Sequence, residues 1–154
     1  MIEEGQKAPD ISLQLPDEST AKLSSYKGKP LVLYFYPKDD TPGCTKEAIG
    51  FTELAGKFAK AGARIVGVSK DPPAKHRKFT DKYDLQVELA TDADGTVTEA
   101  FGVWVEKNMY GRKYMGIQRA TFLIDAEGKV AKVWPKVKVA GHAEDVLEAV
   151  KALG

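Results

Sequence analysis

The sequence predicts an α/β fold in which helices flank both faces of a mixed central sheet. Short apolar or β-branched runs alternate with longer segments whose apolar residues recur every three to four positions, the pattern of an α/β domain. The chain then closes with two strand-like segments and a last helix. Because two strands joined by a short turn form a hairpin, the sheet should contain antiparallel as well as parallel pairs.

After an irregular first segment, the chain predicts a short N-terminal hairpin. Ile11, Leu13 and Leu15 alternate with polar residues, as in a half-buried strand. The turn-forming residues 16–19 then lead into a second strand at 20–23. This hairpin precedes the first α/β unit and should extend the sheet at its N-terminal side.

Residues 31–36 have the pattern of a strand that is covered on both faces, a continuous apolar run closed by Pro37. The helix that follows should begin at Thr41 and Pro42, because threonine is a good N-cap and proline suits the first helical position. One apolar stripe with spacings of four and three residues continues along it: Cys44, Ala48, Phe51, Ala55 and Phe58. Cys44 heads this stripe, so it should face the interior at the rim of the sheet.

The middle of the chain predicts a second α/β unit and a short helix. The expected elements are a buried strand at 64–69, a helix at about 74–83, a brief strand at 89–91 and a helix at 94–101. Residues 102–116 contain tryptophan, tyrosine and methionine without a clean period. We expect a structured aromatic loop there.

The last part of the chain predicts a hairpin and a helix. Residues 119–125 and 130–134 are strand-like and are separated by a turn, and residues 143–153 carry an apolar helical face. A strand, a turn and a helix that begins with cysteine, followed by a terminal hairpin and helix, form a thioredoxin-like arrangement.

Length and composition favour one soluble domain that spans residues 1–154. The 154 residues are 43% hydrophobic and 29% charged, enough for one packed core and short for two. The 23 basic and 22 acidic residues are interleaved and leave a net charge of +1, which favours neither nucleic acid nor an anionic membrane as a partner. No apolar run approaches the ~20 residues of a membrane helix, so we expect a cytoplasmic protein.

Cys44 is the only cysteine, so it is an inert core thiol, a metal ligand or a reactive group. Its place in the first helical turn puts free backbone N–H groups and the positive end of the helix dipole beside the sulfur, which favours a thiolate. The Thr41 hydroxyl and the turn through Gly43 can add donors on the same side. Buried cysteine is common, however, so the sequence is also compatible with Cys44 as an unreactive core residue.

Two carboxylates in the same turn work against a thiolate. Asp39 and Asp40 are like charges near the sulfur, so a cation must outweigh them. Lys38 is nearby but long and exposed. We choose Arg119, which opens the strand at 120–125, because a guanidinium donates hydrogen bonds in a fixed geometry.

Several other cysteine chemistries lack their partners. A thioredoxin-type reductase needs a second cysteine, a phosphatase loop needs an arginine where this chain has Gly50, and a cysteine protease needs a histidine base. We expect His76 to be half-buried on its helix and His142 to act as a helix cap. A metal centre lacks its cluster of ligands, and a nucleotide-binding loop is also missing.

The segment around Cys44 resembles the active-site motif of peroxiredoxins. It reads Tyr36-Pro37-Lys38-Asp39-Asp40-Thr41-Pro42-Gly43-Cys44-Thr45-Lys46-Glu47. The Asp-Thr-Pro-Gly-Cys-Thr version is similar to the Q-type branch, also called bacterioferritin comigratory proteins. Residues 102–111, 116–125 and 141–144 match that branch as well, so the resemblance covers nearly the whole chain.

This resemblance implies a thiol-dependent peroxidase that needs no cofactor and no metal. Cys44 would be the peroxidatic cysteine, which attacks hydrogen peroxide or an organic hydroperoxide and becomes a sulfenic acid. Thr41 and Arg119 would bind the peroxide oxygens, with Gly43 in the donor turn. Pro37 would shield the sulfur from water. Glu47 would orient an arginine by ion pairing, or else complement the helix dipole as an acid in the first turn.

The resemblance also shows a departure. Many Q-type members carry a resolving cysteine where this chain has Ile49, and others near the position of Thr80. The resemblance therefore implies a one-cysteine mechanism in which an external thiol attacks the sulfenic acid. The expected partners are a low-molecular-weight thiol, thioredoxin or glutaredoxin, and the expected state is a monomer or weak homodimer.

Two other functions remain compatible with the residues. A peroxide-sensing relay would use the same sulfenic acid to oxidise a partner protein. A thioredoxin-like binding or chaperone module would carry Cys44 as a structural residue only. The rate at which Cys44 reacts with peroxide separates these functions.

Overall fold

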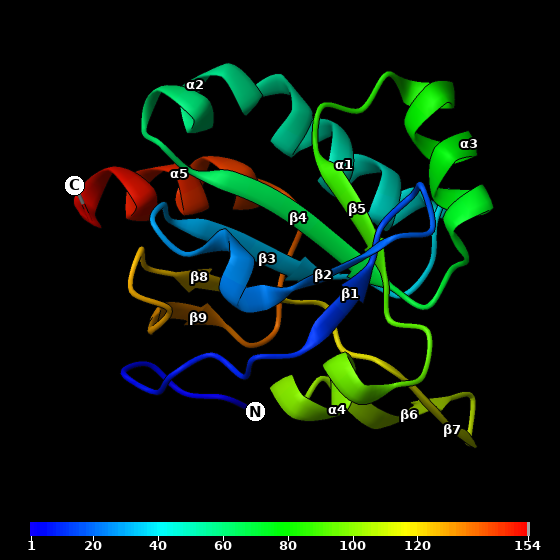
Figure 1. Cartoon of the computed structure of the whole chain (residues 1–154). Coiled ribbons are helices and arrows are strands. Elements are labelled where there is room, and N and C mark those ends of the chain that lie inside the picture. The colour runs from blue at the N-terminus through cyan, green and yellow to red at the C-terminus, as the bar shows by residue number, and fades with distance from the viewer. Residues whose placement is uncertain (154) are drawn as a thin grey trace.

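The structure is a computed structural model that describes residues 1–153. Seven strands form the central sheet: β1 (Ser12–Gln14), β2 (Thr20–Lys22), β3 (Leu31–Phe35), β4 (Arg64–Ser69), β5 (Glu88–Thr91), β8 (Ala120–Ile124) and β9 (Val130–Trp134). Their order across the sheet is β2-β1-β5-β4-β3-β8-β9 (Figure 1). The three central strands are parallel, and the pairs on either side are antiparallel.

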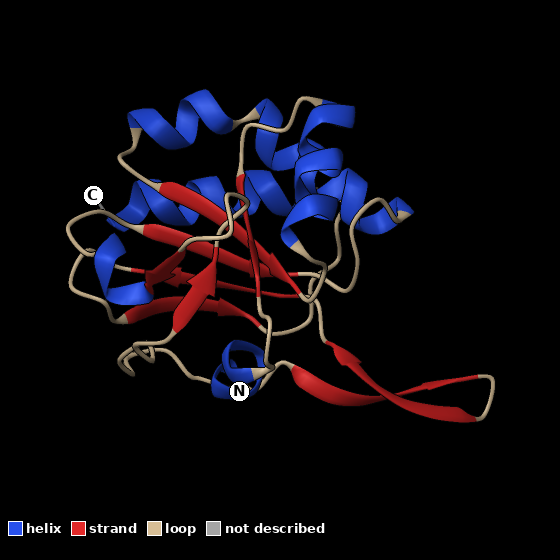
Figure 2. Ribbon diagram, turned by 45° about the vertical axis from the view of Figure 1, so that its right-hand side comes forward, coloured by secondary structure: helices blue, strands red, loops and turns tan. Residues whose placement is uncertain are grey.

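Helices cover both faces of the sheet (Figures 1 and 2). One face is covered by α1 (Pro42–Glu53), α2 (Ala55–Lys60), α3 (Pro73–Tyr83) and α5 (His142–Leu153). The short helix α4 (Thr96–Phe101) and the 3-10 helix η1 (Leu23–Tyr26) pack on the other face. The predicted α/β architecture with a mixed sheet, helices on both faces and an N-terminal hairpin is therefore confirmed.

The central strand β3 separates two hydrophobic cores. Every residue of β3 is buried, because successive side chains point to opposite faces of a sheet that is covered on both sides. Val32 and Tyr34 join the core under α1 and α5, whereas Leu33 and Phe35 join the core under α4. The chain leaves β3 toward α1 at the end of the sheet where the candidate active site lies.

The helix predicted from the stripe that begins at Cys44 is interrupted. It divides at Leu54 into α1 and α2, so the expectation of one continuous helix is wrong. Leu54 has φ −101° and ψ 3°, and its N–H donates to the carbonyl of Phe51, three residues back, in addition to Thr52. The stripe survives the bend because Phe51 and Phe58 still pack into the same core.

The predicted aromatic loop at 102–116 is wrong, because this segment forms a β-hairpin. Its strands are β6 (Trp104–Met109) and β7 (Arg112–Ile117), a separate two-stranded sheet that projects from the body (Figure 2). Tyr110 and Gly111 both have positive φ, 54° and 80°, as a tight two-residue hairpin turn requires. Most side chains of this hairpin are exposed on both faces, so no apolar alternation marks its strands.

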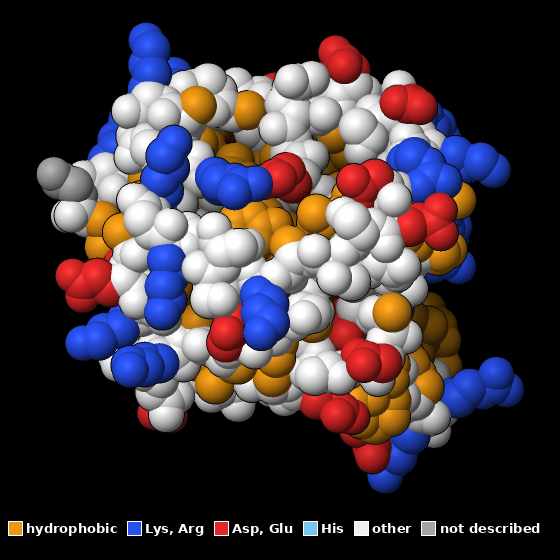
Figure 3. All heavy atoms as spheres, in the orientation of Figure 1, with side chains coloured by type: hydrophobic (Ala, Val, Ile, Leu, Met, Phe, Trp, Pro, Cys, Tyr) orange, Lys and Arg blue, Asp and Glu red, His pale blue; other side chains and the backbone are white. Residues whose placement is uncertain are grey.

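The surface carries charges of both signs. Figure 3 shows Lys and Arg side chains interspersed with Asp and Glu over the face in view. Within residues 1–153, no helix combines the length and the apolar character that a membrane crossing demands.

Candidate active site

Cys44 lies in the first turn of α1, where the sequence places it. Thr41 is the N-cap residue, with extended backbone angles, Pro42 follows at the first helical position, and the Thr45 N–H donates to the Thr41 carbonyl at 2.8 Å. The N–H groups of Gly43 and Cys44 thus precede the first helical hydrogen bond and are free to face an anion. Only 2% of Cys44 is exposed, because its side chain heads the apolar stripe of the helix.

Arg119 reaches the sulfur from the far end of the sequence. Its Nη2 donates to Cys44 Sγ at 3.3 Å. The sheet explains this contact, because β8 runs antiparallel to β3 with Ala120 opposite Phe35. Arg119 directly precedes β8 and so lies beside the point where the chain leaves β3 for α1.

Gly43 provides the space that the guanidinium occupies. A Cβ atom at this position would lie 3.1 Å from Arg119 Nη2. That distance is shorter than an ordinary carbon–nitrogen contact, so any larger residue would push Arg119 away from its place. The glycine predicted as part of the donor turn thus also makes room for Arg119.

Glu47 binds Arg119 through the guanidinium nitrogen that does not contact Cys44. Glu47 Oε1 accepts a hydrogen bond from Arg119 Nη1 at 2.7 Å, and the carboxylate is 1% exposed against 17% for the Arg119 side chain. Burial raises the pKa of Glu47 from 4.5 to about 7, although the Arg119 charge acts in the opposite direction. Within residues 1–153, Glu47 Oε2 has no hydrogen-bond partner.

Glu47 should give the protein a distinctive pH dependence of stability. Because its pKa rises from 4.5 to about 7 on folding, the folded state binds more protons than the unfolded chain between these values. The free energy of unfolding should therefore fall as pH rises through this range, and Glu47→Gln should lose this contribution. Urea unfolding at about pH 5 and about pH 7.5 measures it.

A matched variant separates this effect from those of other carboxyl groups. Glu53→Gln removes an exposed acid from the other end of the same helix. It should follow the wild-type pH dependence. If Glu47→Gln also follows the wild type, the buried carboxyl is not the source of the effect.

Thr41 holds the turn before the helix. Its Oγ1 donates to the Lys38 carbonyl at 2.8 Å, which leaves the oxygen lone pairs free to accept. Among residues 1–153 no hydrogen bond joins Thr41 Oγ1 to Cys44 or Arg119. Pro37 follows β3 and is exposed. The structure thus brings together Cys44, Gly43, Glu47 and Arg119 by direct contacts, with Thr41 at the start of the same helix.

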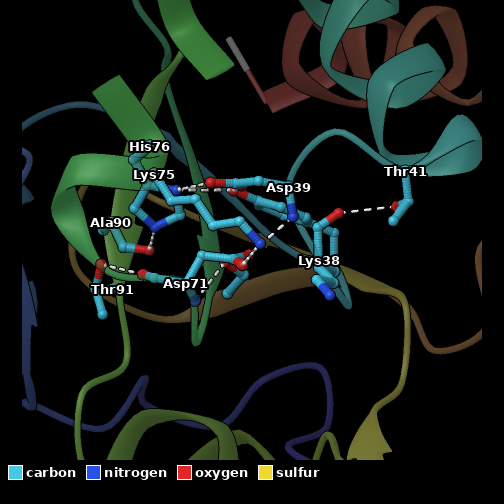
Figure 4. A network of polar contacts seen from close by, with 10 residues as sticks. Lys38, Asp39, Thr41, Asp71, Lys75, His76, Ala90 and Thr91 are labelled. Atoms are coloured by element: carbon cyan, nitrogen blue, oxygen red, sulfur yellow. Dashed lines mark hydrogen bonds and ion pairs between the residues drawn. The ribbon is translucent and has the colours of Figure 1, made fainter. Parts of the chain in front are cut away.

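A buried network supports the turn from within (Figure 4). Asp39 is 4% exposed as a whole residue, its carboxyl group lies 2.7 Å from His76 Nδ1, and it also accepts from Tyr36 Oη. His76 Nε2 lies 3.0 Å from the Ala90 carbonyl, which can only accept. Both ring nitrogens therefore have a polar partner inside the core, and His76 connects the turn to α3 and β5.

This network corrects the expectations for His76 and for the acidic turn. His76 is fully buried rather than half-buried, and its ring provides a direct hydrogen-bond partner for the Asp39 carboxyl group. Asp40 is compensated by Lys82 Nζ at 2.7 Å and Tyr83 Oη at 2.6 Å, and these bonds lower the Asp40 pKa. The two carboxylates that seemed to oppose a thiolate are thus both paired with α3.

The network continues to Asp71, two residues after the end of β4. The Asp39 N–H donates to Asp71 Oδ2 at 2.8 Å, and the Ser69 hydroxyl donates to the same oxygen at 2.7 Å. Sequence reasoning missed these partners, because residues that are far apart and follow no period meet only in the fold. One signal was available in the sequence: Asp39 and Asp40 directly follow a buried strand, and a carboxylate next to a buried strand needs a polar partner.

The sequence suggested that His142 caps the last helix, but the structure places it inside α5 as the first helical residue. It is 5% exposed at the first position of α5, and its Nε2 lies 2.8 Å from Thr121 Oγ1. Burial lowers the pKa of His142 to about 4, so the ring is neutral at physiological pH. Ile49 packs against the core beneath α1, and Thr80 is half-buried on α3.

Within residues 1–153, no group of three or more His, Cys, Asp or Glu side chains is arranged to hold a metal ion. The site consists of a thiol, a guanidinium, a buried carboxylate and free backbone donors. This set can stabilise negative charge on sulfur and on a small molecule bound in front of it.

Comparisons with known proteins identify the family of this chain. Residues 4–133 match the AhpC/TSA family. Peroxiredoxin Bcp of Bacillus subtilis is 51% identical over 150 residues, which cover 97% of this chain and 96% of the relative. Peroxiredoxin Bcp of Xanthomonas campestris is 48% identical over 143 residues, which cover 93% and 89% respectively.

Solved structures show the same fold. The bacterioferritin comigratory protein of X. campestris, studied for its alkyl peroxide reduction activity, superposes with a TM-score of 0.91 at 44% identity and covers 98% of this chain and 99% of its own. A cysteine-to-serine mutant of Xylella fastidiosa PrxQ superposes with a TM-score of 0.93 at 38% identity and covers 99% and 98%. The predicted thioredoxin-like fold is thereby confirmed, and the chain, with its single cysteine, belongs to the AhpC/TSA family and within it to the Q-type peroxiredoxins.

Proposed function

We propose that Cys44 is the peroxidatic cysteine of this thiol-dependent peroxidase and that Arg119, Thr41 and Gly43 form its peroxide site. The contact between Arg119 Nη2 and Cys44 Sγ at 3.3 Å carries the proposal. It places a fixed cation beside the sulfur at a helix N-terminus, the environment in which a thiolate is stable. The Glu47 ion pair holds that cation in position.

The geometry suggests how each group takes part. The Cys44 thiolate attacks one peroxide oxygen, the O–O bond breaks, and the departing oxygen takes up a proton and leaves as water or an alcohol. Arg119 and the free helix N–H groups donate to the oxygens while negative charge develops on them. Thr41 donates to Lys38, so its lone pairs accept the peroxide O–H and orient the substrate. Pro37, at the exposed mouth of the turn, limits the access of water.

The reductant is an external thiol, because Cys44 is the only cysteine. We assign this role to a low-molecular-weight thiol, thioredoxin or glutaredoxin in the cytoplasm, with the protein acting as a monomer or weak homodimer. The alkyl peroxide reduction activity of the X. campestris relative supports organic hydroperoxides as substrates beside hydrogen peroxide.

Rapid mixing of the reduced protein with hydrogen peroxide tests this function. We expect Cys44 to be oxidised orders of magnitude faster than a free cysteine, and mass spectrometry should find one added oxygen on its peptide. Cys44→Ser is the control and should consume no peroxide. Oxidation no faster than that of free cysteine would show that Cys44 is structural, and turnover with a single protein partner alone would indicate a relay.

A further inference from the structure

The β6–β7 hairpin is attached directly to the arginine of the active site. Only Gln118 separates the end of β7 from Arg119, and the Gln118 N–H donates to the Val103 carbonyl at 2.7 Å, which closes the root of the hairpin. The hairpin therefore starts at the site and extends outward (Figure 2). Side chains near its root lie close to Arg119.

Lys107 on β6 leans toward this root. In the register of the hairpin Lys107 faces Tyr114, while Gly116 lies two pairs nearer to the root, opposite Val105 and on the same face as Lys107. Lys107 Cδ and Cε lie 3.2 and 3.5 Å from the position that a Cβ of Gly116 would occupy. The aliphatic part of Lys107 thus crosses over Gly116, which carries the ammonium toward Arg119 and away from the hairpin tip.

Among residues 1–153, Lys107 makes no ion pair, whereas Arg119 is held by Glu47, and Lys113 on the opposite face of the hairpin has Glu106 at 3.8 Å. Burial and the positive charge of Arg119 lower the pKa of Lys107, and the charge of Cys44 raises it. Lys107 is therefore within electrostatic range of both active-site groups. It is an uncommitted positive charge at the mouth of the site.

We propose that Lys107 binds the negative group of a small anionic thiol and guides that thiol to the oxidised Cys44. This inference rests on the proposed function, which supplies the sulfenic acid. The thiolate sulfur attacks the Cys44 sulfur, an S–S bond forms, the S–O bond breaks, and the hydroxide takes up a proton and leaves as water. The thiol is oxidised and Cys44 is reduced from sulfenic acid to a mixed disulfide, which a second thiol then cleaves.

The chemistry of the two half-reactions explains why the reductant needs this cation. Hydrogen peroxide is neutral, and Arg119 already faces the oxygens that become charged. The attacking thiol arrives as a thiolate, and Cys44 is 2% exposed, so a productive approach is narrow. A free cation beside that approach raises the local concentration of anions and excludes cationic thiols.

A series of thiols of different charge tests this proposal. The protein is first oxidised with one equivalent of hydrogen peroxide and then mixed with mercaptosuccinate, 2-mercaptoethanol or cysteamine, which carry negative, zero and positive charge beside the sulfur. Lys107→Gln should slow the reaction with mercaptosuccinate about three- to tenfold at low ionic strength, and high salt should abolish the difference. The reaction with 2-mercaptoethanol should change less than about twofold, and cysteamine should react equally fast or faster.

Lys113→Gln is the matched control, because it removes a lysine from the opposite face of the same hairpin. It should leave all three rates unchanged. An equal effect of Lys107→Gln on all three thiols, or the same pattern with Lys113→Gln, would overturn the role of Lys107. A wild-type protein that fails to consume peroxide in the first step would instead overturn the proposed function, so the two failures are distinguishable.

Discussion

Arg119→Met should lower the rate constant of peroxide reduction by about two to three orders of magnitude. Methionine keeps much of the length of the side chain but removes both the hydrogen bond to Cys44 Sγ and the positive charge at 3.3 Å. The protein should remain folded, because Glu47, whose pKa is already raised to about 7, can take up a proton when its partner is lost. Rapid mixing with hydrogen peroxide measures the rate, and circular dichroism checks the fold.

Two further variants sharpen the interpretation of this loss. Arg119→Met combined with Glu47→Gln removes both charges and should show the same low rate with a smaller loss of stability. Arg119→Lys keeps the charge without the planar fork and should give an intermediate rate. A normal rate in Arg119→Met would refute the role of Arg119 in binding peroxide.

The buried pair of Asp39 and His76 should have the largest effect on stability. His76→Leu leaves the Asp39 carboxyl group buried without its histidine partner, and breaking a buried pair of this kind costs about 3–5 kcal/mol of unfolding free energy. The side chains are 1% and 0% exposed, so water cannot replace the lost partner. Urea unfolding measures the difference from the wild type.

A double-mutant cycle separates the Asp39–His76 interaction from the loss of side-chain volume. His76→Leu combined with Asp39→Asn removes the unpaired carboxyl group, and it should be more stable than His76→Leu alone. Additive losses in the two single variants would mean that the pair is not coupled. In that case the turn before Cys44 would be held by the contacts of Asp71 and Asp40 instead.

The sequence predicted most of the fold because the buried elements carry local patterns. The apolar run at 31–36 and the stripe headed by Cys44 each reflect burial; the run forms β3 as expected, and the stripe forms helical structure, although divided into α1 and α2. The β6–β7 hairpin was missed since solvent contacts both of its faces, which removes the alternation that marks a strand. The division of the helix at Leu54 depends on packing, and no residue there breaks a helix by itself.

The candidate site could be predicted only in part. Cys44 and Thr41 lie in one continuous motif, and Arg119 was placed because it opens a strand. The pairing of Asp39 with His76 joins residues that are separated by α1, α2 and β4, and no periodicity connects them. Lys107 was part of a segment noted for its resemblance, but its position near Arg119 follows from a hairpin that the sequence did not reveal.

The attachment of the acidic turn to α3 influences which thiols can reach Cys44. The Cys44 sulfur lies behind a turn that Asp39 fastens to His76 and that Asp40 fastens to Lys82. Cys44 is 2% exposed and the Arg119 side chain 17%, so a small thiol would reach the sulfur from the Arg119 side with these contacts intact. We expect a thiol on a folded protein, which is bulkier, to react faster when the turn is detached from α3. The two pairings with α3 would then link the stability of the turn to the size of the reductant.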